Sequence, residues 1–331
     1  IDGFLVRTGV SIGVSCYPQH GSTAQELLSN ADIAMYRAKD DPKCRVHAYN
    51  SELDQVVRER RMIAADLKEA VDSDALDVHF QPQACVGTGK ICGFEALARW
   101  KHPERGMVAP DVFIPIAEEN GLINSLGNSI MRKSCEAALN WPDQVSVSVN
   151  VSALQIRYTD LVTIVRTMLY ETGLPANRLE LEVTESILIN DFDHALHVLR
   201  GLKNLGVSLA MDDFGTGYSS LSSIVEFPFD KLKIDRSFIM ELDKKAKVST
   251  IAKAMIGLGK NLGLKLIAEG VETAEHVRFL REQGCEEMQG YYLSPAIKDT
   301  EILPFIAAQH AKHTTVVEPG PDAPSRRVVV A

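Results

Sequence analysis

The sequence predicts an α/β protein: a (β/α)8 TIM-type barrel with an antiparallel first strand, preceded by a short α+β fragment. Eight strand candidates alternate with helical segments over about 240 residues, which suits one closed barrel. The first two candidates are joined by Gly87–Lys90, too short a connection for a crossover helix, so these strands should pair antiparallel. An open doubly wound sheet is the alternative, but no Gly-x-Gly-x-x-Gly motif opens a helix.

The first 50 residues are expected to be a truncated domain, because so short a segment buries too little apolar surface to fold alone. Apolar residues that alternate or recur at helical spacing mark its elements. These are a strand over 6–14, a helix over 24–39 and a strand over 45–49. A charged helix over 51–71 follows, and we assign residues 51–73 to a linker.

Residues 74–311 carry the predicted barrel. The strand candidates are 76–81, 91–97, 145–150, 178–183, 207–212, 230–235, 264–269 and 286–290. The helical candidates are 112–139 (broken near Gly121), 159–172, 191–204, 217–226, 245–261, 273–282 and 300–311. Most connections are long enough for a helix, which favours parallel strands. Residues 312–331 form a Pro- and Gly-containing tail that we expect to be mobile.

Composition limits the partners. The 331 residues carry 35 Lys and Arg against 44 Asp and Glu, a net charge of −9, which argues against coating DNA or RNA polymers. Six scattered cysteines without metal-binding spacing indicate reduced thiols and a cytoplasmic location. No apolar run is long enough to span a bilayer, so no membrane contact is expected from this segment. Because the chain starts at Ile1, we expect a longer parent that could be membrane-anchored upstream.

Two adjacent acids, Asp212 and Asp213, follow the apolar run Val207–Met211 and precede a glycine turn. Neighbouring strand residues point to opposite faces, so both acids reach one cleft only where the strand ends. Two close carboxylates repel each other unless a proton or cation lies between them. The alternative is an Asp that caps a helix beside a solvated neighbour.

Every strand candidate carries a polar residue near its carboxyl end. In order these are Gln81; Glu95, with Arg99 beyond it; Asn150; Glu182; Asp212 and Asp213; Lys233 and Asp235; Glu269; and Gln289. Each has an ordinary alternative reading, such as a turn residue for Asn150 or a helix-start acid for Glu269. A barrel enzyme, however, draws its chemistry from several strands at this rim, and the recurrence on every strand favours an active site.

These residue types suit metal-dependent hydrolysis of a phosphodiester. Acidic and amide oxygens are ligands for Mg²⁺ or Mn²⁺, and two such ions can share a carboxylate and activate water for in-line attack. Asp212 is the candidate for the shared ligand, and Asp213 for a single ion. Lys233 can stabilise the water and the developing charge, and Arg99 can bind a phosphate through two hydrogen bonds.

The motifs resemble the EAL family of cyclic di-GMP phosphodiesterases over roughly residues 58–311. They are Gln81-Pro82, Glu95-Ala96-Leu97-Ala98-Arg99, Asn150-Val151-Ser152, Glu182-Val183-Thr184-Glu185, the twelve residues from Ala210 to Leu221, Lys233-Ile234-Asp235, Ala268-Glu269-Gly270-Val271-Glu272 and Gln289-Gly290-Tyr291. The tripeptide Glu95-Ala96-Leu97 gives the family its name. Eight motifs in order make the resemblance specific.

The resemblance implies a barrel with a reversed first strand that cleaves cyclic di-GMP to linear pGpG with two Mg²⁺ or Mn²⁺ ions, while Ca²⁺ inhibits. The implied metal ligands are Glu95, Asn150, Glu182, Asp212, Asp213 and Glu269. Lys233 and Glu269 carry the implied water-positioning and general-base roles, and Glu95 is also placed among the catalytic residues. The implied substrate-binding residues are Gln81, Leu97, Arg99, Asp235, Glu272 and Gln289. Glu185 matches a glutamate that braces the loop after Asp213.

No metal position departs from the family pattern, which favours an active enzyme over a silent cyclic di-GMP receptor. An unrelated barrel enzyme, such as an aldolase or an enolase-type lyase, is the remaining alternative. It would need a phosphate-binding glycine loop or a Schiff-base lysine, whereas Lys233 stands among acids. The resemblance also implies a homodimer through the segment after Asp213, although its apolar residues suit a local core equally.

The first 50 residues resemble the end of a GGDEF, or diguanylate cyclase, domain. The resemblance rests on Val10–Ser15 and Ala31–Lys39. The Gly-Gly loop and the metal-binding acids of such a domain are absent from these residues, so this segment is not expected to synthesise cyclic di-GMP. The parent protein is expected to be a tandem GGDEF–EAL regulator.

Overall fold

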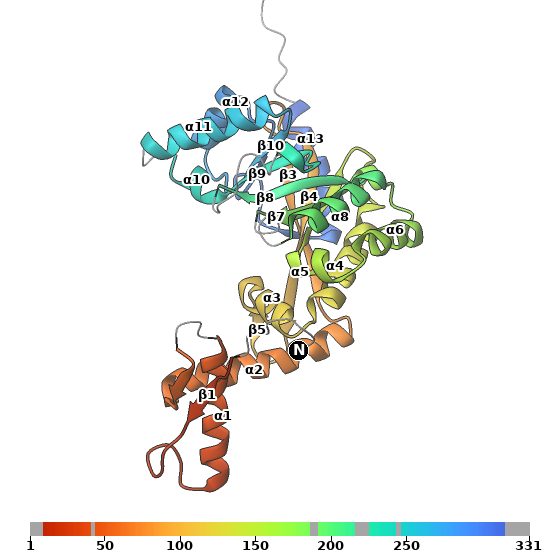
Figure 1. Cartoon of the computed structure of the whole chain (residues 1–331). Coiled ribbons are helices and arrows are strands. Elements are labelled where there is room, and N and C mark those ends of the chain that lie inside the picture. The colour runs from red at the N-terminus through yellow and green to blue at the C-terminus, as the bar shows by residue number, and fades with distance from the viewer. Residues whose placement is uncertain (1–8, 41–43, 186–190, 216–224, 243–245, 315–331) are drawn as a thin grey trace, which may run out of the picture. The chain divides into compact units, whose positions relative to one another are not determined.

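The computed structural model describes residues 9–40, 44–185, 191–215, 225–242 and 246–314 (Figure 1). The chain divides into two compact units. One comprises residues 1–73 with 111–122, and the other comprises residues 74–110 with 123–331. Residues 315–331 of the predicted tail, most of the helix expected over 217–226 and the start of the strand expected from residue 6 lie outside the described residues. Residues 312–314, which were assigned to the tail, belong to the last helix.

The first unit holds a β-α-β fragment. The parallel strands β1 (Ile12–Val14) and β2 (Val46–Ala48) pack against helix α1 (Ala24–Asp40). Gly13 permits this contact, because a Cβ there would lie 1.9 Å from the Ala31 carbonyl oxygen. The predicted helix and second strand are confirmed.

Two further helices complete this unit, and both are attached by ion pairs. The predicted charged helix is α2 (Ser51–Asp72), which packs against α1. Arg61 of α2 pairs with Asp32 of α1 at 3.2 Å. Arg60 pairs at 2.6 Å with Glu119, the last residue of α3 (Pro110–Glu119).

The second unit is the predicted barrel, and its eight strands are confirmed. In order around the ring they are β3 (Asp77–Cys85), β4 (Ile91–His102), β6 (Ser146–Val151), β7 (Leu179–Thr184), β8 (Ser208–Phe214), β9 (Lys231–Ile234), β10 (Lys265–Ala268) and β11 (Glu287–Gln289). Strand β3 closes the ring by pairing antiparallel with both β4 and β11, whereas the other neighbours are parallel. Two short strands were not predicted. Strand β5 (Gly106–Val108) pairs antiparallel with β4, and β12 (Ile297–Lys298) pairs antiparallel with β3.

Helices connect the parallel strands, as Figure 1 shows. They are α4 (Ile123–Ala138), α5 (Ala153–Tyr158), α6 (Leu161–Thr172), the 3-10 turn η1 (Ala176–Arg178), α8 (Phe192–Asn204), α10 (Arg236–Met240), α11 (Ala246–Asn261) and α12 (Ala274–Gln283). Helix α13 (Asp299–Thr314) follows the last strand. The predicted break near Gly121, whose φ is 71°, is confirmed. Helices α5 and α10 were missed because five or six residues show too little periodicity.

The barrel has an apolar outer layer and a polar interior. On β9 all four residues are buried, and their side chains alternate between the two faces. Lys231 and Lys233 lie on the inner face, where they contact acids from other strands. Leu232 and Ile234 lie on the outer face. This alternation places two ammonium groups at two depths of one barrel.

Candidate active site

A fully buried ammonium group organises the carboxyl end of the barrel. The Lys233 Nζ atom lies 2.5 Å from Glu182 Oε2, 2.7 Å from Glu269 Oε1, 3.2 Å from Asp212 Oδ1 and 3.6 Å from Glu95 Oε2. Four different strands, or the residues directly after them, supply these carboxylates. We call Glu95, Glu182, Asp212, Asp213, Lys233 and Glu269 the upper layer.

Glu95 is held on both oxygens by amides from β6 and β11. Asn150 Nδ2 donates to Glu95 Oε1 at 2.7 Å, and Gln289 Nε2 donates to Glu95 Oε2 at 2.5 Å. The same Gln289 nitrogen donates to Gln81 Oε1 at 3.0 Å. Gln81 and Glu95 are register partners on β3 and β4. The carboxylate is therefore oriented before any ligand binds.

A register shift in β8 brings Asp212 and Asp213 to one place. The pairing of β8 with β9 is irregular between Met211 and Phe214, as in a bulge. Asp213 has a φ of 55°, a left-handed conformation that Asp tolerates better than most residues, and its N–H donates to Asp212 Oδ1 at 2.9 Å. Single oxygens of Asp212, Asp213 and Glu269 consequently lie within 4.8 Å of one another.

Gly215, two residues after this pair, is tied to the residue that follows β7. Its N–H donates to Glu185 Oε2 at 3.3 Å, and the loop-bracing role of Glu185 stays a prediction. Residues 216–224, which include most of the segment predicted to form a dimer contact, lie outside the described residues.

Burial and mutual repulsion raise the pKa of several acids. Burial raises the pKa of Glu182 well above its ordinary value, with Glu95 and Asp212 adding to the effect. Burial, and then Asp212, raises the pKa of Glu269 to about 7 and also raises the pKa of Asp213. Lys233 opposes each shift. The cluster therefore holds more negative charge than its lysine neutralises.

Glu95 and Lys233 shift toward their charged forms. Burial disfavours ionised Glu95, but Lys233 and the hydrogen bonds from Gln289 and Asn150 outweigh it, so the pKa of Glu95 is lowered. Burial also disfavours charged Lys233, but Asp212, Glu182 and Glu269 raise its pKa well above the ordinary value. Lys233 is thus a permanent cation and hydrogen-bond donor.

The donor set fits hard divalent cations. All its potential ligand atoms are oxygens, the type that Mg²⁺, Mn²⁺ and Ca²⁺ prefer. Five carboxylates face one ammonium. Among the described atoms, the buried Glu182 Oε1 has no hydrogen-bond partner. An unsatisfied buried carboxylate oxygen beside a surplus of negative charge is what a metal ligand leaves when the ion is removed.

The predicted substrate residues differ in their surroundings. Arg99 is half-buried, and its pKa is lowered by burial against the opposing charges of Glu95 and Tyr291. Leu97 is also half-buried, and on β4 it is two residues nearer to Glu95 than Arg99 is. Asp235 caps α10 by accepting from the Ser237 N–H at 3.0 Å, and its charge helps to raise the pKa of Asp213. Glu272 is exposed, with its N–H donating to His276 Nδ1 at 3.4 Å.

Two groups of interior residues escaped the sequence-based prediction. The first is Gln83, fully buried on β3, which donates to Gln289 Oε1 at 3.0 Å. The second, which we call the lower layer, consists of Ser148, Glu180, Lys231 and Glu287. Spacing by two along a strand was the available signal, because Gln83 follows Gln81, Glu180 precedes Glu182 and Lys231 precedes Lys233.

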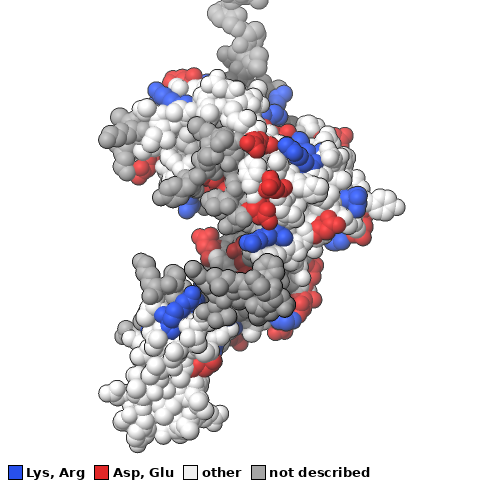
Figure 2. All heavy atoms as spheres, viewed as in Figure 1, with Lys and Arg blue, Asp and Glu red and all other residues white. Residues whose placement is uncertain are grey.

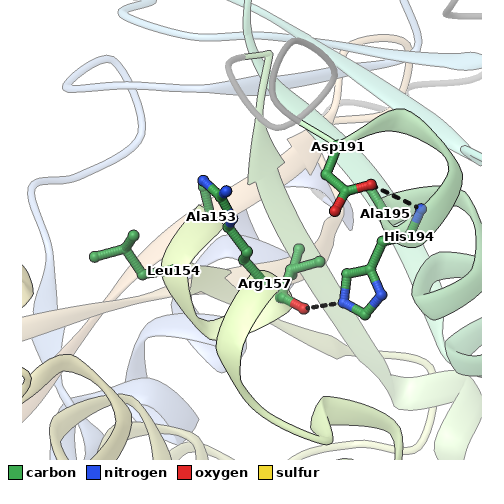
Figure 3. A pocket seen from close by; sticks show the side chains of 7 residues that line it. Ala153, Leu154, Arg157, Asp191, His194 and Ala195 are labelled. Carbon is green, nitrogen blue, oxygen red and sulfur yellow. Dashed lines mark hydrogen bonds between the residues drawn. The ribbon is translucent and has the colours of Figure 1, made fainter. Parts of the chain in front are cut away.

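A separate hollow lies between α5 and α8 (Figure 3). Its polar groups have structural partners: the His194 ring of α8 contacts the Ile156 carbonyl oxygen of α5 at 3.1 Å, and Asp191 caps α8 by accepting from the His194 N–H at 3.4 Å. Its volume is about 50 Å³. Ligand pockets are usually several hundred Å³, so this hollow is too small for a dinucleotide.

Two family models match the chain. The EAL domain model matches residues 64–296, and the diguanylate cyclase GGDEF domain model matches residues 5–45. The chain is 46% identical over 327 residues to an uncharacterized signaling protein of Caulobacter vibrioides, covering 98% of this chain and 39% of that protein. It is 39% identical over 306 residues to the bifunctional diguanylate cyclase/cyclic di-GMP phosphodiesterase MucR of Pseudomonas aeruginosa, covering 91% of this chain and 45% of MucR. The chain thus spans less than half of these relatives.

A solved structure shares the barrel. The PaMucR phosphodiesterase in complex with c-di-GMP aligns with a TM-score of 0.70 and 39% sequence identity, covering 73% of this chain and 99% of that one. Within the described residues, no helix combines the length and apolar character needed to cross a membrane. On the face drawn in Figure 2, the described Lys and Arg residues form separate groups and not a continuous basic stripe.

Proposed function

The chain belongs to the EAL-domain family, and from that premise we propose that it hydrolyses cyclic di-GMP to linear pGpG at the upper layer with two divalent cations. The observation that carries the proposal is the surplus of carboxylates around Lys233 at the carboxyl end of the barrel. The MucR domain, a relative named as a cyclic di-GMP phosphodiesterase, has been solved with c-di-GMP bound. The proposed reaction attaches water to phosphorus and breaks one bond between phosphorus and a ribose oxygen.

Glu95, Asn150, Glu182, Asp212, Asp213 and Glu269 would hold the cations. Asp212 is the proposed shared ligand, and the placement of one of its oxygens within 4.8 Å of single oxygens of both Asp213 and Glu269 is consistent with this role. Bound cations supply positive charge that polarises the phosphate and favours ionisation of water. We propose Mg²⁺ or Mn²⁺ for this role and expect Ca²⁺ to inhibit, because its larger coordination sphere fits a compact site less well.

Lys233 and Glu269 divide the remaining work. Lys233 keeps its protons and therefore donates hydrogen bonds, orienting Glu182 and Glu269 and stabilising charge that develops at phosphorus. Glu269, whose pKa burial raises to about 7, is suited to exchange a proton with the attacking water near neutral pH. Glu95 completes the acidic frame around the lysine.

Arg99 is the proposed phosphate clamp. It lies on β4 beyond Glu95, half-buried, and its guanidinium can make two parallel hydrogen bonds to a phosphate. Gln81, Leu97, Asp235, Glu272 and Gln289 are proposed to frame the nucleotide. Of these, Gln289 already donates hydrogen bonds from its side-chain nitrogen to Glu95 and Gln81, so we expect it to shape the base of the site more than to bind substrate directly.

Product analysis tests this function. The chain is incubated with cyclic di-GMP in Mg²⁺, Mn²⁺, Ca²⁺ or EDTA, and nucleotides are separated by chromatography. We expect pGpG with Mg²⁺ or Mn²⁺, and none with EDTA. Glu95→Ala and Asp212→Ala should each remove activity, while Ser148→Ala, in the lower layer, should keep it.

Two outcomes would overturn parts of the proposal. Binding of cyclic di-GMP without cleavage in every metal would identify a silent receptor in place of an enzyme. Full activity of Asp212→Ala would contradict the shared-ligand assignment. Both outcomes are readable from the same nucleotide separation together with a calorimetric measurement of binding.

The remaining assignments are proposals about context. We propose a cytoplasmic reaction, consistent with six free cysteines, and a homodimer through the segment after Asp213, which sedimentation can test. The boundaries 1–50, 51–73, 74–311 and 312–331 also stay a prediction. The GGDEF match at residues 5–45 supports a tandem parent in which another domain regulates this barrel.

A further inference from the structure

A chain of side-chain amides leads from the interior of the barrel to Glu95. Gln83 Nε2 donates to Gln289 Oε1 at 3.0 Å, and Gln289 Nε2 donates in turn to Glu95 Oε2 at 2.5 Å. Gln83 is fully buried and Gln289 is 4% exposed, so water does not compete for these bonds. The chain crosses three adjacent strands, β11, β3 and β4, in which Gln83 and Gln289 are register partners.

The reversed direction of β3 makes this arrangement possible. In a parallel strand, later residues lie nearer to the carboxyl-end rim. In β3 they lie deeper, so Gln83 stands below Gln81 on the same face. Gln81 accepts from Gln289 near the rim, and Gln83 donates to it from beneath. The Gln289 amide is thus fixed from two levels by one strand.

The charge on Glu95 sets the direction of every bond in the chain. A carboxylate only accepts hydrogen bonds, so Gln289 must turn its NH₂ group toward Glu95. Its oxygen then faces Gln83, which must present its own NH₂ group. Glutamine is otherwise nearly symmetric in shape, and a rotated Gln289 amide would bring its oxygen against the Glu95 carboxylate. Gln83 is the donor that makes the correct orientation of Gln289 the favourable one.

This arrangement costs stability. Within the described part of the chain, Gln83 Oε1 is buried without a hydrogen-bond partner. An unsatisfied buried polar atom is unfavourable, and an apolar side chain of similar length would avoid it. Packing therefore does not explain a glutamine here, whereas the bond to Gln289 does.

We propose that Gln83 is a positioning residue for the metal ligand Glu95, acting through Gln289. The proposal rests on the proposed function, in which Glu95 holds a cation. Without the Gln83 donor, Gln289 Oε1 is left buried without its partner and the amide loses its fixed orientation. Glu95 Oε2 then loses its shortest hydrogen bond and can turn toward Lys233, which lies 3.6 Å away. Partners that orient metal ligands in this way typically change metal affinity 10- to 100-fold.

Metal binding without nucleotide provides the direct test. Mn²⁺ is titrated calorimetrically into the chain and into Gln83→Met, which keeps the length of the side chain and removes the donor. We expect the dissociation constant of at least one Mn²⁺ to rise about tenfold. The matched control is Ser148→Ala, which removes a buried hydrogen bond to Glu180 in the same barrel interior and should change Mn²⁺ affinity less than about twofold.

A double-variant cycle separates positioning from a general loss of packing. If Gln83 acts through Gln289, Gln83→Met should have little further effect on Mn²⁺ affinity in a Gln289→Leu background. Additive losses would contradict the relay, and so would unchanged Mn²⁺ affinity in Gln83→Met. If Gln83→Met fails to fold, the comparison of Gln83→Asn with Gln83→Asn/Gln289→Leu carries the same test with a shorter amide.

The readout also separates this inference from the proposed reaction. Wild-type chain that binds Mn²⁺ but does not cleave cyclic di-GMP would overturn the enzyme and leave the Gln83 cycle decisive. Wild-type chain that binds no Mn²⁺ would overturn both. In an active enzyme, Gln83→Met should lower kcat at limiting Mn²⁺, and kcat should return toward the wild-type value at saturating Mn²⁺. The KM for cyclic di-GMP should change less than about twofold.

Discussion

Two lysines that lie two residues apart on β9 stand in contrasting surroundings. In the lower layer, Lys231 Nζ pairs with Glu180 Oε2 at 3.0 Å and Glu287 Oε2 at 2.7 Å. Ser148 Oγ donates to the other Glu180 oxygen at 2.8 Å. In the upper layer, Lys233 faces Glu182, Glu269, Asp212 and Glu95, with Asp213 adjacent. Both ammonium groups are buried, and their acidic neighbours raise the pKa of each.

The balance of charge around each lysine distinguishes the lower layer, with a structural role, from the upper layer, the proposed active site. Two carboxylates around Lys231 leave a small surplus of charge, and each pairs directly with the ammonium group. Five carboxylates around Lys233 leave a surplus that requires cations or protons. A buried lysine is therefore not in itself a sign of a site. The sign is the number of acidic groups that the lysine leaves uncompensated.

The largest expected effect comes from removing the upper ammonium. Lys233→Met should lower the turnover of cyclic di-GMP about 10³-fold, because both the donor that orients Glu269 and the positive charge near phosphorus are lost. Steady-state kinetics at saturating Mn²⁺ measures the loss. A decrease below tenfold would remove Lys233 from the catalytic residues.

The lower layer should respond in the opposite way. Lys231→Met leaves Glu180 and Glu287 buried without their cation, and breaking such a pair typically costs about 3–5 kcal/mol of unfolding free energy. Turnover per folded molecule should stay within about twofold. Urea unfolding with and without Mn²⁺ measures the stability, and Lys231→Met/Glu180→Gln/Glu287→Gln is the control that should recover part of it. A stable but inactive Lys231→Met would erase the distinction between the layers.

The sequence was sufficient for the barrel because its pattern is local. Each strand shows an apolar run between turn residues, and the short connection Gly87–Lys90 forces the antiparallel start. The polar rim was readable for the same reason, since a residue such as Glu269 directly follows its strand. The carboxyl ends of the barrel strands form one rim, so polar residues at these ends lie together even when they are far apart in the sequence.

For residues deeper in the barrel, spacing by two shows which of them share the inner face, but the sequence does not show which of them meet. Lys231 on β9 and Glu287 on β11 meet across β10, so their pairing depends on the register of three strands and cannot be read from either strand alone. Gln83 looks like an ordinary strand residue until β3 is known to run against its neighbours. The bulge at Asp212 and Asp213 likewise depends on pairing with β9. Long-range register, more than residue type, limits what the sequence predicts.

The pH dependence of stability gives the smallest of the three expected effects and separates the layers without nucleotide. Burial raises the pKa of Glu269 to about 7 from the usual 4.5, so the folded chain without metal binds this proton more tightly than the unfolded chain. The contribution of Glu269 is therefore present at low pH and is lost as the pH rises from about 4.5 through 7, on the order of 3 kcal/mol. Glu269→Gln, which cannot ionise, should not show this loss.

Urea unfolding in EDTA between pH 4.5 and 8 measures the difference between wild type and Glu269→Gln. That difference should widen with pH in favour of the variant, and Mn²⁺ should abolish the widening because a cation replaces the proton as the partner of Glu269. For Glu180→Gln, the lower-layer control, the difference in unfolding free energy from wild type should be the same with and without Mn²⁺. A difference between wild type and Glu269→Gln that is independent of pH would mean that Lys233 already compensates Glu269. The surplus of negative charge that distinguishes the upper layer would then have to reside on Glu182 and Asp213.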